Sequence, residues 1–289
     1  MFKSISDLIK TAEQTNTSIA ELMIAQEQQM QSKSREEIVA TMLASYQVMK
    51  QAVAEGIQGV TSHSKMCGHD ARRLWEYIQK GKFITDITSL KAACYAIATN
   101  EVNASMGVIC ATPTAGSCGI LPGAMVALQE KYDFTDEKIV EALFVAGMFG
   151  FIIANNAFIS GAAGGCQAEI GSASAMTAAA TVYLLGGSPT QSANAMAMAM
   201  KNMLGLTCDP LAGLVEVPCI KRNAAGAVNA LLTAELALAD IETKVPWDEV
   251  VAAMYAIGKS MPASLRETAL GGLAATPTGD EWKRILWSK

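Results

Sequence analysis

Residues 142–171 read ALFVAGMFGFIIANNAFISGAAGGCQAEIG, an apolar run of helix length followed by a glycine-rich turn. Across residues 142–200 the only charged side chain is that of Glu169. A run with so little charge has to lie inside a protein or inside a membrane. Residues 173–185 and 193–203 are rich in Ala and Met, and we expect them to be buried helices as well.

A membrane span is the first alternative to consider. Residues 143–159 approach the length that a bilayer needs. However, Asn155 and Asn156 stand side by side in this run, and loop glycines and Gln167 follow at once. Lipid would penalise these amides, whereas the centre of a helical bundle can pair them. We therefore expect a bundle helix and no membrane.

The composition favours tightly packed helices. Of the 289 residues 51% are hydrophobic and only 17% are charged, whereas about 25% is usual in soluble domains. The core should therefore be large, or a partner should cover part of the surface. Aromatic residues are scarce and Ala, Gly and Met are abundant, which favours closely approaching helices over a β-sandwich. The net charge of −5 argues against nucleic acid as a ligand.

Capping patterns predict three helices near the N-terminus. Ser4, Ser18 and Ser34 each stand where the N-cap of a helix is expected. These helices, in about residues 1–60, could pack as an appendage to the remainder.

The later part of the chain also reads as helical. Two further helices are expected to begin near Asp70 and near Ser188. Two more are expected to cover residues 223–240 and residues 247–259. Only residues 108–111 offer a possible short strand. The predicted fold is all-α: one large domain of residues 1–289, with buried Ala-, Gly- and Met-rich helices and with cysteines on loops.

The cysteines indicate a reducing compartment. There are seven, an odd number, and the N-terminus lacks the basic-then-apolar pattern of a secretory signal. We therefore expect reduced thiols and a cytoplasmic location. For Cys67 and Cys94 the simplest interpretation is a small buried hydrophobic residue.

Three other cysteines suggest a metal centre. Cys166, Cys208 and Cys219 each lie beside Gly or Pro, which interrupt helices. Three sulfur ligands without an obvious fourth would leave one coordination position open, as catalysis requires. A structural zinc site usually has a C-x-x-C pair, and this chain has none. An iron–sulfur cluster held by three cysteines suits the pattern better, but spacing alone leaves both metals possible.

Four loops could place polar groups around such a centre: residues 112–117, 160–166, 208–219 and 271–279. Their glycines would let backbone N–H groups approach a substrate carboxylate. The alternative is that they merely separate helices.

Longer motifs carry a family resemblance. Residues 160–171 read SGAAGGCQAEIG, and residues 208–219 read CDPLAGLVEVPC. Together with NEVNA at 100–104, ATPTAG at 111–116 and the 271–279 loop, they resemble the alpha chain of iron–sulfur-dependent L-serine dehydratase. The likeness covers nearly the whole chain, and the cysteine motifs are long enough to make chance agreement improbable.

The resemblance implies a cofactor and a reaction. Cys166, Cys208 and Cys219 would bind a [4Fe–4S] cluster whose fourth iron polarises the β-hydroxyl of L-serine. The products would be pyruvate and ammonia, without pyridoxal phosphate, in amino-acid degradation and gluconeogenesis.

The resemblance also implies a partner. Single-chain members carry a C-terminal cysteine that can occupy the fourth iron, whereas this chain ends in Trp287-Ser288-Lys289. They also carry an additional N-terminal region, which the two-subunit type supplies as a beta chain. We therefore expect a heterodimer with a beta chain.

Six residues are candidates for the remaining chemistry. The candidate catalytic residues are Ser62, Thr112 and Thr114, and the candidate substrate-binding residues are Asn103, Ser160 and Gly161. His63, Lys65 and His69 share a polar loop, but Lys65 and His69 replace glycines of the family and are expected to be solvated. The catalytic base stays open: it could be a hydroxyl here or a group of the partner.

Two other classes of protein remain as alternatives. A pyridoxal-phosphate enzyme would need a Schiff-base lysine, and residues 142–200 contain none. A non-catalytic helical zinc protein would use the same thiols without sulfide.

Overall fold

Helices account for the regular structure of residues 2–288, the part of the chain that the computed structural model describes. Within these residues there are no strands, only two isolated bridges, so the all-α prediction is confirmed. The α-helices are α1 (Ile5–Thr15), α2 (Ile19–Gln31), α3 (Arg35–Gln58), α4 (Asp70–Gln79), α5 (Ile87–Ala104), α6 (Ile120–Tyr132), α7 (Asp136–Asn156), α8 (Gly161–Gly164), α9 (Ser172–Leu184), α10 (Pro189–Lys201), α11 (Cys219–Leu238), α12 (Trp247–Ser260) and α13 (Pro277–Trp287).

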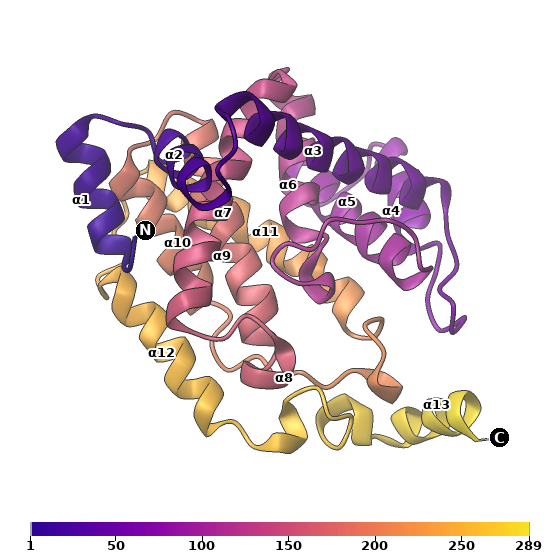
Figure 1. Cartoon of the computed structure of the whole chain (residues 1–289). Coiled ribbons are helices and arrows are strands. Elements are labelled where there is room, and N and C mark those ends of the chain that lie inside the picture. The colour runs from indigo at the N-terminus through magenta and orange to yellow at the C-terminus, as the bar shows by residue number, and fades with distance from the viewer. Residues whose placement is uncertain (1, 289) are drawn as a thin grey trace.

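The apolar runs form the centre of the bundle. Helix α9 packs against α7, α10 and α11, while α5 packs against α6 and α11 (Figure 1). Nearly every residue of α9 is buried, including its Ser and Thr side chains. The long uncharged stretch of sequence is therefore the core of the protein, as predicted.

The N-terminal helices share this core. Ser4, Ser18 and Ser34 cap α1, α2 and α3 as predicted, and Ser34 forms a complete capping box with Glu37. Ile5 and Tyr46 are fully buried in the main hydrophobic cluster. Because α2 packs on α7 and α3 packs on α5, these helices are part of the bundle.

Two details of the prediction were wrong. Residues 108–111 have no regular structure and form no bridge with another described segment. Asn155 and Asn156 are exposed at the C-terminal end of α7, where their amides donate to the carbonyls of Phe151 and Ile152. They satisfy the end of the helix and do not pair inside the bundle.

Helix α7 is the one helix in residues 2–288 that is long and apolar enough to cross a membrane, judged by length and composition. Two thirds of its most apolar window (67%) is buried by other helices. Core helices of soluble proteins have the same character.

Glycines permit the closest helix contacts. A Cβ on Gly123 of α6 would lie 2.6 Å from the carbonyl oxygen of Ala92 in α5, and a Cβ on Gly56 of α3 would lie 2.3 Å from that of Ala98. Both distances are below van der Waals contact with rigid backbone. Small residues at helix contacts are thus a requirement of this packing.

This packing predicts opposite effects for two glycine substitutions. Gly123→Ala should lower the free energy of unfolding by about 1–3 kcal/mol, because α5 and α6 would have to move apart. Gly147→Ala in α7 should be neutral or stabilising by up to about 1 kcal/mol, since its Cβ would meet only Met23 Cε at 3.8 Å. Urea denaturation measures both values, and equal effects would contradict the proposed contact.

Candidate active site

Three cysteine-bearing segments meet at one end of the bundle. Cys166 directly precedes the π-helical turn Gln167–Gly171 that leads into α9, and Cys208 lies in the connection between α10 and α11. Cys219 is the first residue of α11, which begins four residues earlier than the predicted start at Asn223. All three side chains are buried, with at most 4% of their surface exposed.

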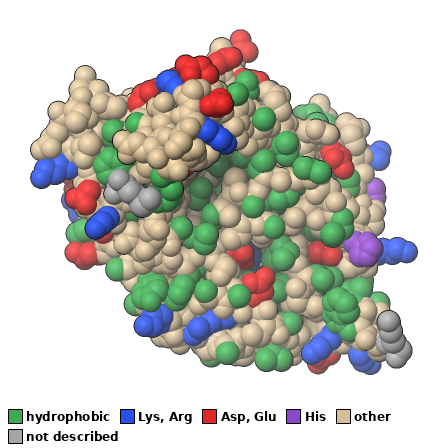
Figure 2. All heavy atoms as spheres, in the orientation of Figure 1, with side chains coloured by type: hydrophobic (Ala, Val, Ile, Leu, Met, Phe, Trp, Pro, Cys, Tyr) green, Lys and Arg blue, Asp and Glu red, His purple; other side chains and the backbone are tan. Residues whose placement is uncertain are grey.

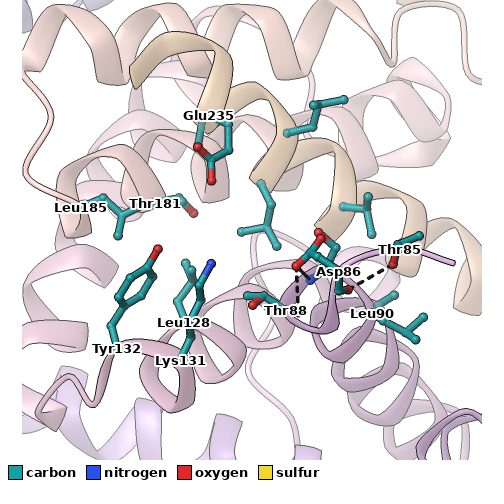
Figure 3. A pocket seen from close by; sticks show the side chains of 16 residues that line it. Thr85, Asp86, Thr88, Leu90, Leu128, Lys131, Tyr132, Thr181, Leu185 and Glu235 are labelled. Carbon is teal, nitrogen blue, oxygen red and sulfur yellow. Dashed lines mark hydrogen bonds between the residues drawn. The ribbon is translucent and has the colours of Figure 1, made fainter. Parts of the chain in front are cut away.

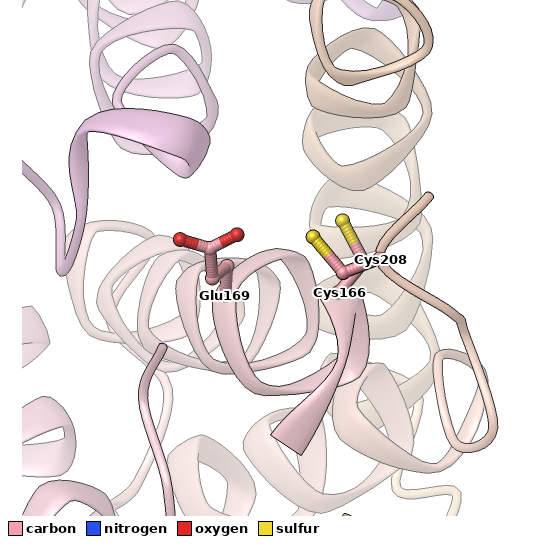
Figure 4. Close-up of side chains that lie close together, drawn as sticks. All are labelled: Cys166, Glu169 and Cys208. Atoms are coloured by element: carbon pink, nitrogen blue, oxygen red, sulfur yellow. The ribbon is translucent and has the colours of Figure 1, made fainter. Parts of the chain in front are cut away.

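Two of the sulfurs lie close to a carboxylate. We use the name thiol group for this set of side chains, Cys166, Cys208 and Glu169, together with the neighbouring Cys219. The Sγ atoms of Cys166 and Cys208 and one carboxylate oxygen of Glu169 all lie within 4.8 Å of one another. Figure 4 shows both sulfurs pointing to the same side of the backbone as the Glu169 carboxylate. Cys219 lies outside this group of three, but the charges at Cys166 and Glu169 act on it, after burial, to raise its pKa.

The two nearest thiols differ in acidity. A hydrogen bond from the Cys208 thiol lowers the pKa of Cys166 against the effect of burial, and the Arg222 guanidinium lowers it further. The same hydrogen bond, together with burial, raises the pKa of Cys208. Cys166 is therefore the group poised to be a thiolate, the form that binds metals.

Arg222 connects the segments that carry the cysteines. Its Nη1 donates to the carbonyl of Thr207 at 2.8 Å, and its Nη2 lies 2.9 Å from Asp209 Oδ1. Asp209 in turn accepts the backbone N–H of Leu273 at 2.8 Å, which attaches the late glycine loop. The guanidinium thus fixes the Cys208 segment to the start of α11.

Asn223 places the 112–117 loop beside this group. Its Nδ2 donates to the carbonyl of Gly116 at 2.8 Å, and its Oδ1 accepts the N–H of Gly119 at 2.9 Å. The loop thereby brings the Thr114 hydroxyl to Glu169, with Oγ1 2.7 Å from Oε1.

Two predicted site residues therefore lie at the thiol group: Thr114 and Gly161. A Cβ on Gly161 would lie 2.7 Å from Cys208 Sγ, so only glycine permits this approach. Ser160 is adjacent and half-buried, and its side chain does not cap α8. The Thr112 hydroxyl is buried and donates to the Cys118 carbonyl at 3.4 Å, so it supports the loop.

Ser62 and Asn103 lie in a neighbouring region. The Ser62 hydroxyl accepts the N–H of Cys67 at 3.1 Å and lies 3.3 Å from that of Ser64. Asn103 donates to the carbonyl of Ala115 at 3.4 Å, on the loop that carries Thr114. Neither side chain contacts the thiol group directly.

A groove of about 590 Å³ adjoins these residues, and its lining includes Ser64, Asn103, Ala115, Glu216, Leu286 and Trp287. Ala115 lines the groove while Gly116, the next residue, packs against Glu169. Hydrophobic and acidic side chains both reach the surface on the face of the molecule drawn in Figure 2. Because Ala115 lines the groove and Gly116 lies against Glu169, the groove is a candidate path by which a substrate could reach the Glu169 carboxylate.

Of the two positions expected to be solvated, Lys65 is exposed but His69 is only partly so. His63 and Lys65 are exposed on the groove. The half-buried His69 ring forms a hydrogen bond with the Thr61 hydroxyl at 3.1 Å.

Glu169, Arg222 and Glu267 were not among the predicted site residues. Glu169 could have been found, because it is the only charge in the apolar run. Arg222 and Glu267 carry no such local signal, and only the fold brings them to the thiols.

A second groove, of about 440 Å³, lies elsewhere, between α5, α6, α9 and α11 (Figure 3). Its carboxylate Asp86 caps α5 by accepting the N–H groups of Thr88 and Ser89. The groove is mostly apolar and contains no cysteine, so it is not the candidate centre.

The thiol group fits two kinds of metal site. Three buried cysteines, one of them (Cys208) closely approached by the backbone of Gly161, would suit an iron–sulfur cluster with one free iron. Cys166, Cys208 and Glu169 alone are a donor set that a single zinc ion also accepts.

Most of the chain is similar to one protein family. Residues 14–274 match the family model described as serine dehydratase alpha chain. The chain is 55% identical over 287 residues to the probable L-serine dehydratase, alpha chain, of Bacillus subtilis, covering 99% of this chain and 96% of the relative. It is 43% identical to the L-serine dehydratase, alpha chain, of Peptoniphilus asaccharolyticus, covering 98% of both.

Longer relatives match over only part of their length. The chain is 39% identical over 281 residues to L-serine dehydratase 2 of Escherichia coli, covering 94% of this chain but 61% of that protein. The similarity thus extends over nearly all of this sequence and to more than one type of relative. The chain belongs to the serine dehydratase alpha chain family.

Proposed function

We propose that this chain is the catalytic subunit of an iron–sulfur enzyme that converts L-serine to pyruvate and ammonia. Relatives named L-serine dehydratase support serine dehydration. The observation that carries the cofactor proposal is the burial of Cys166, Cys208 and Cys219 at one end of the bundle.

The cysteines would hold a [4Fe–4S] cluster through three of its irons. When bound, the cluster would supply a Lewis acid, the fourth iron, that polarises the C–O bond of the β-hydroxyl. Cys166 is favoured as a thiolate, and Arg222 beside it would offset part of the negative charge that three thiolates bring into the interior.

The remaining residues would orient the substrate. Thr114 Oγ1 donates its proton to Glu169 and lies 3.2 Å from the Ser117 hydroxyl, so its oxygen keeps a lone pair that would accept a hydrogen bond from a substrate group. Gly116 and Gly161 pack directly against the Glu169 carboxylate and leave little room for water. A substrate held there would have fixed geometry, which favours loss of the α-proton and of hydroxide from one conformation. The aminoacrylate produced would hydrolyse to pyruvate and ammonia.

We also propose a beta chain as partner. Two relatives are named alpha chains, and the chain spans only 61% of the longer E. coli relative. A separate beta chain would supply the remainder and could contribute the catalytic base. The assembled heterodimer would act in the cytoplasm, in amino-acid degradation that feeds gluconeogenesis.

A zinc protein is the second candidate. It is favoured by one observation, the proximity of Glu169 to Cys166 and Cys208, because a carboxylate and two thiols suit zinc. Zinc without inorganic sulfide in the purified protein would support it.

Replacement of one proposed ligand should remove the cluster. Cys208→Ala, purified anaerobically with the beta chain, should lose most of its iron and acid-labile sulfide and all measurable pyruvate formation from L-serine. Cys110→Ala is the matched control, because Cys110 Sγ donates to the Ser45 carbonyl away from the site. A Cys208→Ala protein with full iron and sulfide would contradict the ligand assignment.

Replacement of the Thr114 hydroxyl should affect catalysis and leave the cluster in place. Thr114→Val keeps the shape but removes the hydrogen bond to Glu169, so kcat/KM for L-serine should fall about 10- to 100-fold. Thr114→Ser should restore most of the activity. Iron content should match the wild type in both, and an unchanged kcat/KM in Thr114→Val would rule out the proposed role.

A further inference from the structure

Two carboxylates converge on the thiol group. A Cβ on Gly161 would lie 2.7 Å from Cys208 Sγ, 2.9 Å from Glu169 Oε2 and 3.1 Å from Glu267 Oε2. The three side-chain atoms therefore surround one point at the backbone of residue 161. Glu267 reaches it from the segment after α12, where its N–H donates to the Cys208 carbonyl at 2.8 Å.

Neither carboxylate has a cationic partner among residues 2–288. No lysine, arginine or histidine of the described chain forms an ion pair with Glu169 or Glu267. Arg222 is engaged by Asp209 and by the Thr207 carbonyl. Glu169 is only 8% exposed, so water can solvate its charge poorly. Burial and the charge of the half-buried Glu267 raise the pKa of Glu169. A cation bound between the two carboxyl groups would offset the cost of keeping both ionised.

Only one oxygen of Glu169 has a side-chain hydrogen-bond partner, and the other has only the backbone of Gly161 as a donor. Its Oε1 accepts the Thr114 hydroxyl at 2.7 Å. Its Oε2 lies on the side of Gly161, with Cys208 and Glu267. Figure 4 shows the carboxylate on the same side of the backbone as the two sulfurs. A cation beside Oε2 would thus be next to the proposed cluster and within reach of Glu267.

L-Serine carries one such cation. Its α-ammonium offers three N–H donors, whereas its hydroxyl and carboxylate are suited to a metal ion. We propose that Glu169 and Glu267 bind the α-ammonium of L-serine; this assignment rests on the proposed function. Serine would then be held at both ends, and hydroxy acids without an ammonium group would bind more weakly.

The rival assignment makes Glu169 a metal ligand, since its oxygen lies within 4.8 Å of two sulfurs. The two assignments predict that substitution of Glu169 has different effects on iron content and on substrate binding. A ligand of the metal is needed to retain iron, whereas an ammonium-binding carboxylate is needed only for substrates that carry the ammonium.

The test uses two isosteric variants, Glu169→Gln and Glu267→Gln, in the anaerobically purified complex with the beta chain. Two probes isolate the ammonium: L-alanine has it but lacks the leaving hydroxyl, and 3-hydroxypropanoate is L-serine without it. Equilibrium dialysis gives Kd for both, steady-state kinetics gives KM for L-serine, and iron and sulfide are counted per chain. Glu235→Gln, in the separate groove of Figure 3, is the control.

We expect Kd for L-alanine and KM for L-serine to rise about 10- to 100-fold in each variant, the usual effect of losing a hydrogen bond to a charged group. Kd for 3-hydroxypropanoate should stay within about twofold or decrease, and iron content should be unchanged. Glu235→Gln should match the wild type in every measurement.

Loss of iron in Glu169→Gln would overturn the inference in favour of metal ligation. Equal weakening of both probes would overturn it in favour of general damage to the site, and unchanged binding of L-alanine would overturn it outright. Failure of the proposed function is distinct, because the wild-type complex would then lack iron or form no pyruvate.

Discussion

A partly buried guanidinium group, paired with a buried carboxylate, organises this end of the bundle. Arg222 is held by Asp209 and by the Thr207 carbonyl, and its charge lowers the pKa of Cys166. Because Asp209 also accepts the N–H of Leu273, the Arg222–Asp209 pair connects four segments distant in sequence. Breaking a buried ion pair leaves an unpaired charge, so these contacts are costly to lose. We expect the proposed cluster site to depend on these contacts.

The apolar core and the polar site depend on the same property, the close approach of backbone. Gly123 lets α6 lie against α5, and Gly116 and Gly161 let two loops lie against the Glu169 carboxylate. The core has small residues because its helices lie close to one another. The site has them because loop backbone lies close to the Glu169 carboxylate and the cysteine sulfurs. This explains why Ala and Gly dominate the sequence on both sides of Cys166.

Helix positions were largely predictable, whereas the membership of the site was only partly so. The caps at Ser4, Ser18, Ser34 and Ser188 are local signals and predicted the helix starts correctly. The strand at 108–111 was wrong, because local sequence does not reveal whether a pairing partner lies nearby. Family motifs pointed to Thr114 and Gly161. The roles of Arg222 and Glu267 arise from contacts distant in sequence, which no spacing pattern contains.

We propose that three sulfurs surround one iron–sulfur cluster. Anomalous diffraction from anaerobically grown crystals of the complex with the beta chain would locate its metal. Iron-edge density enclosed by the Sγ atoms of Cys166, Cys208 and Cys219 is expected. Density at the zinc edge between Cys166, Cys208 and Glu169, with no iron present, would contradict it.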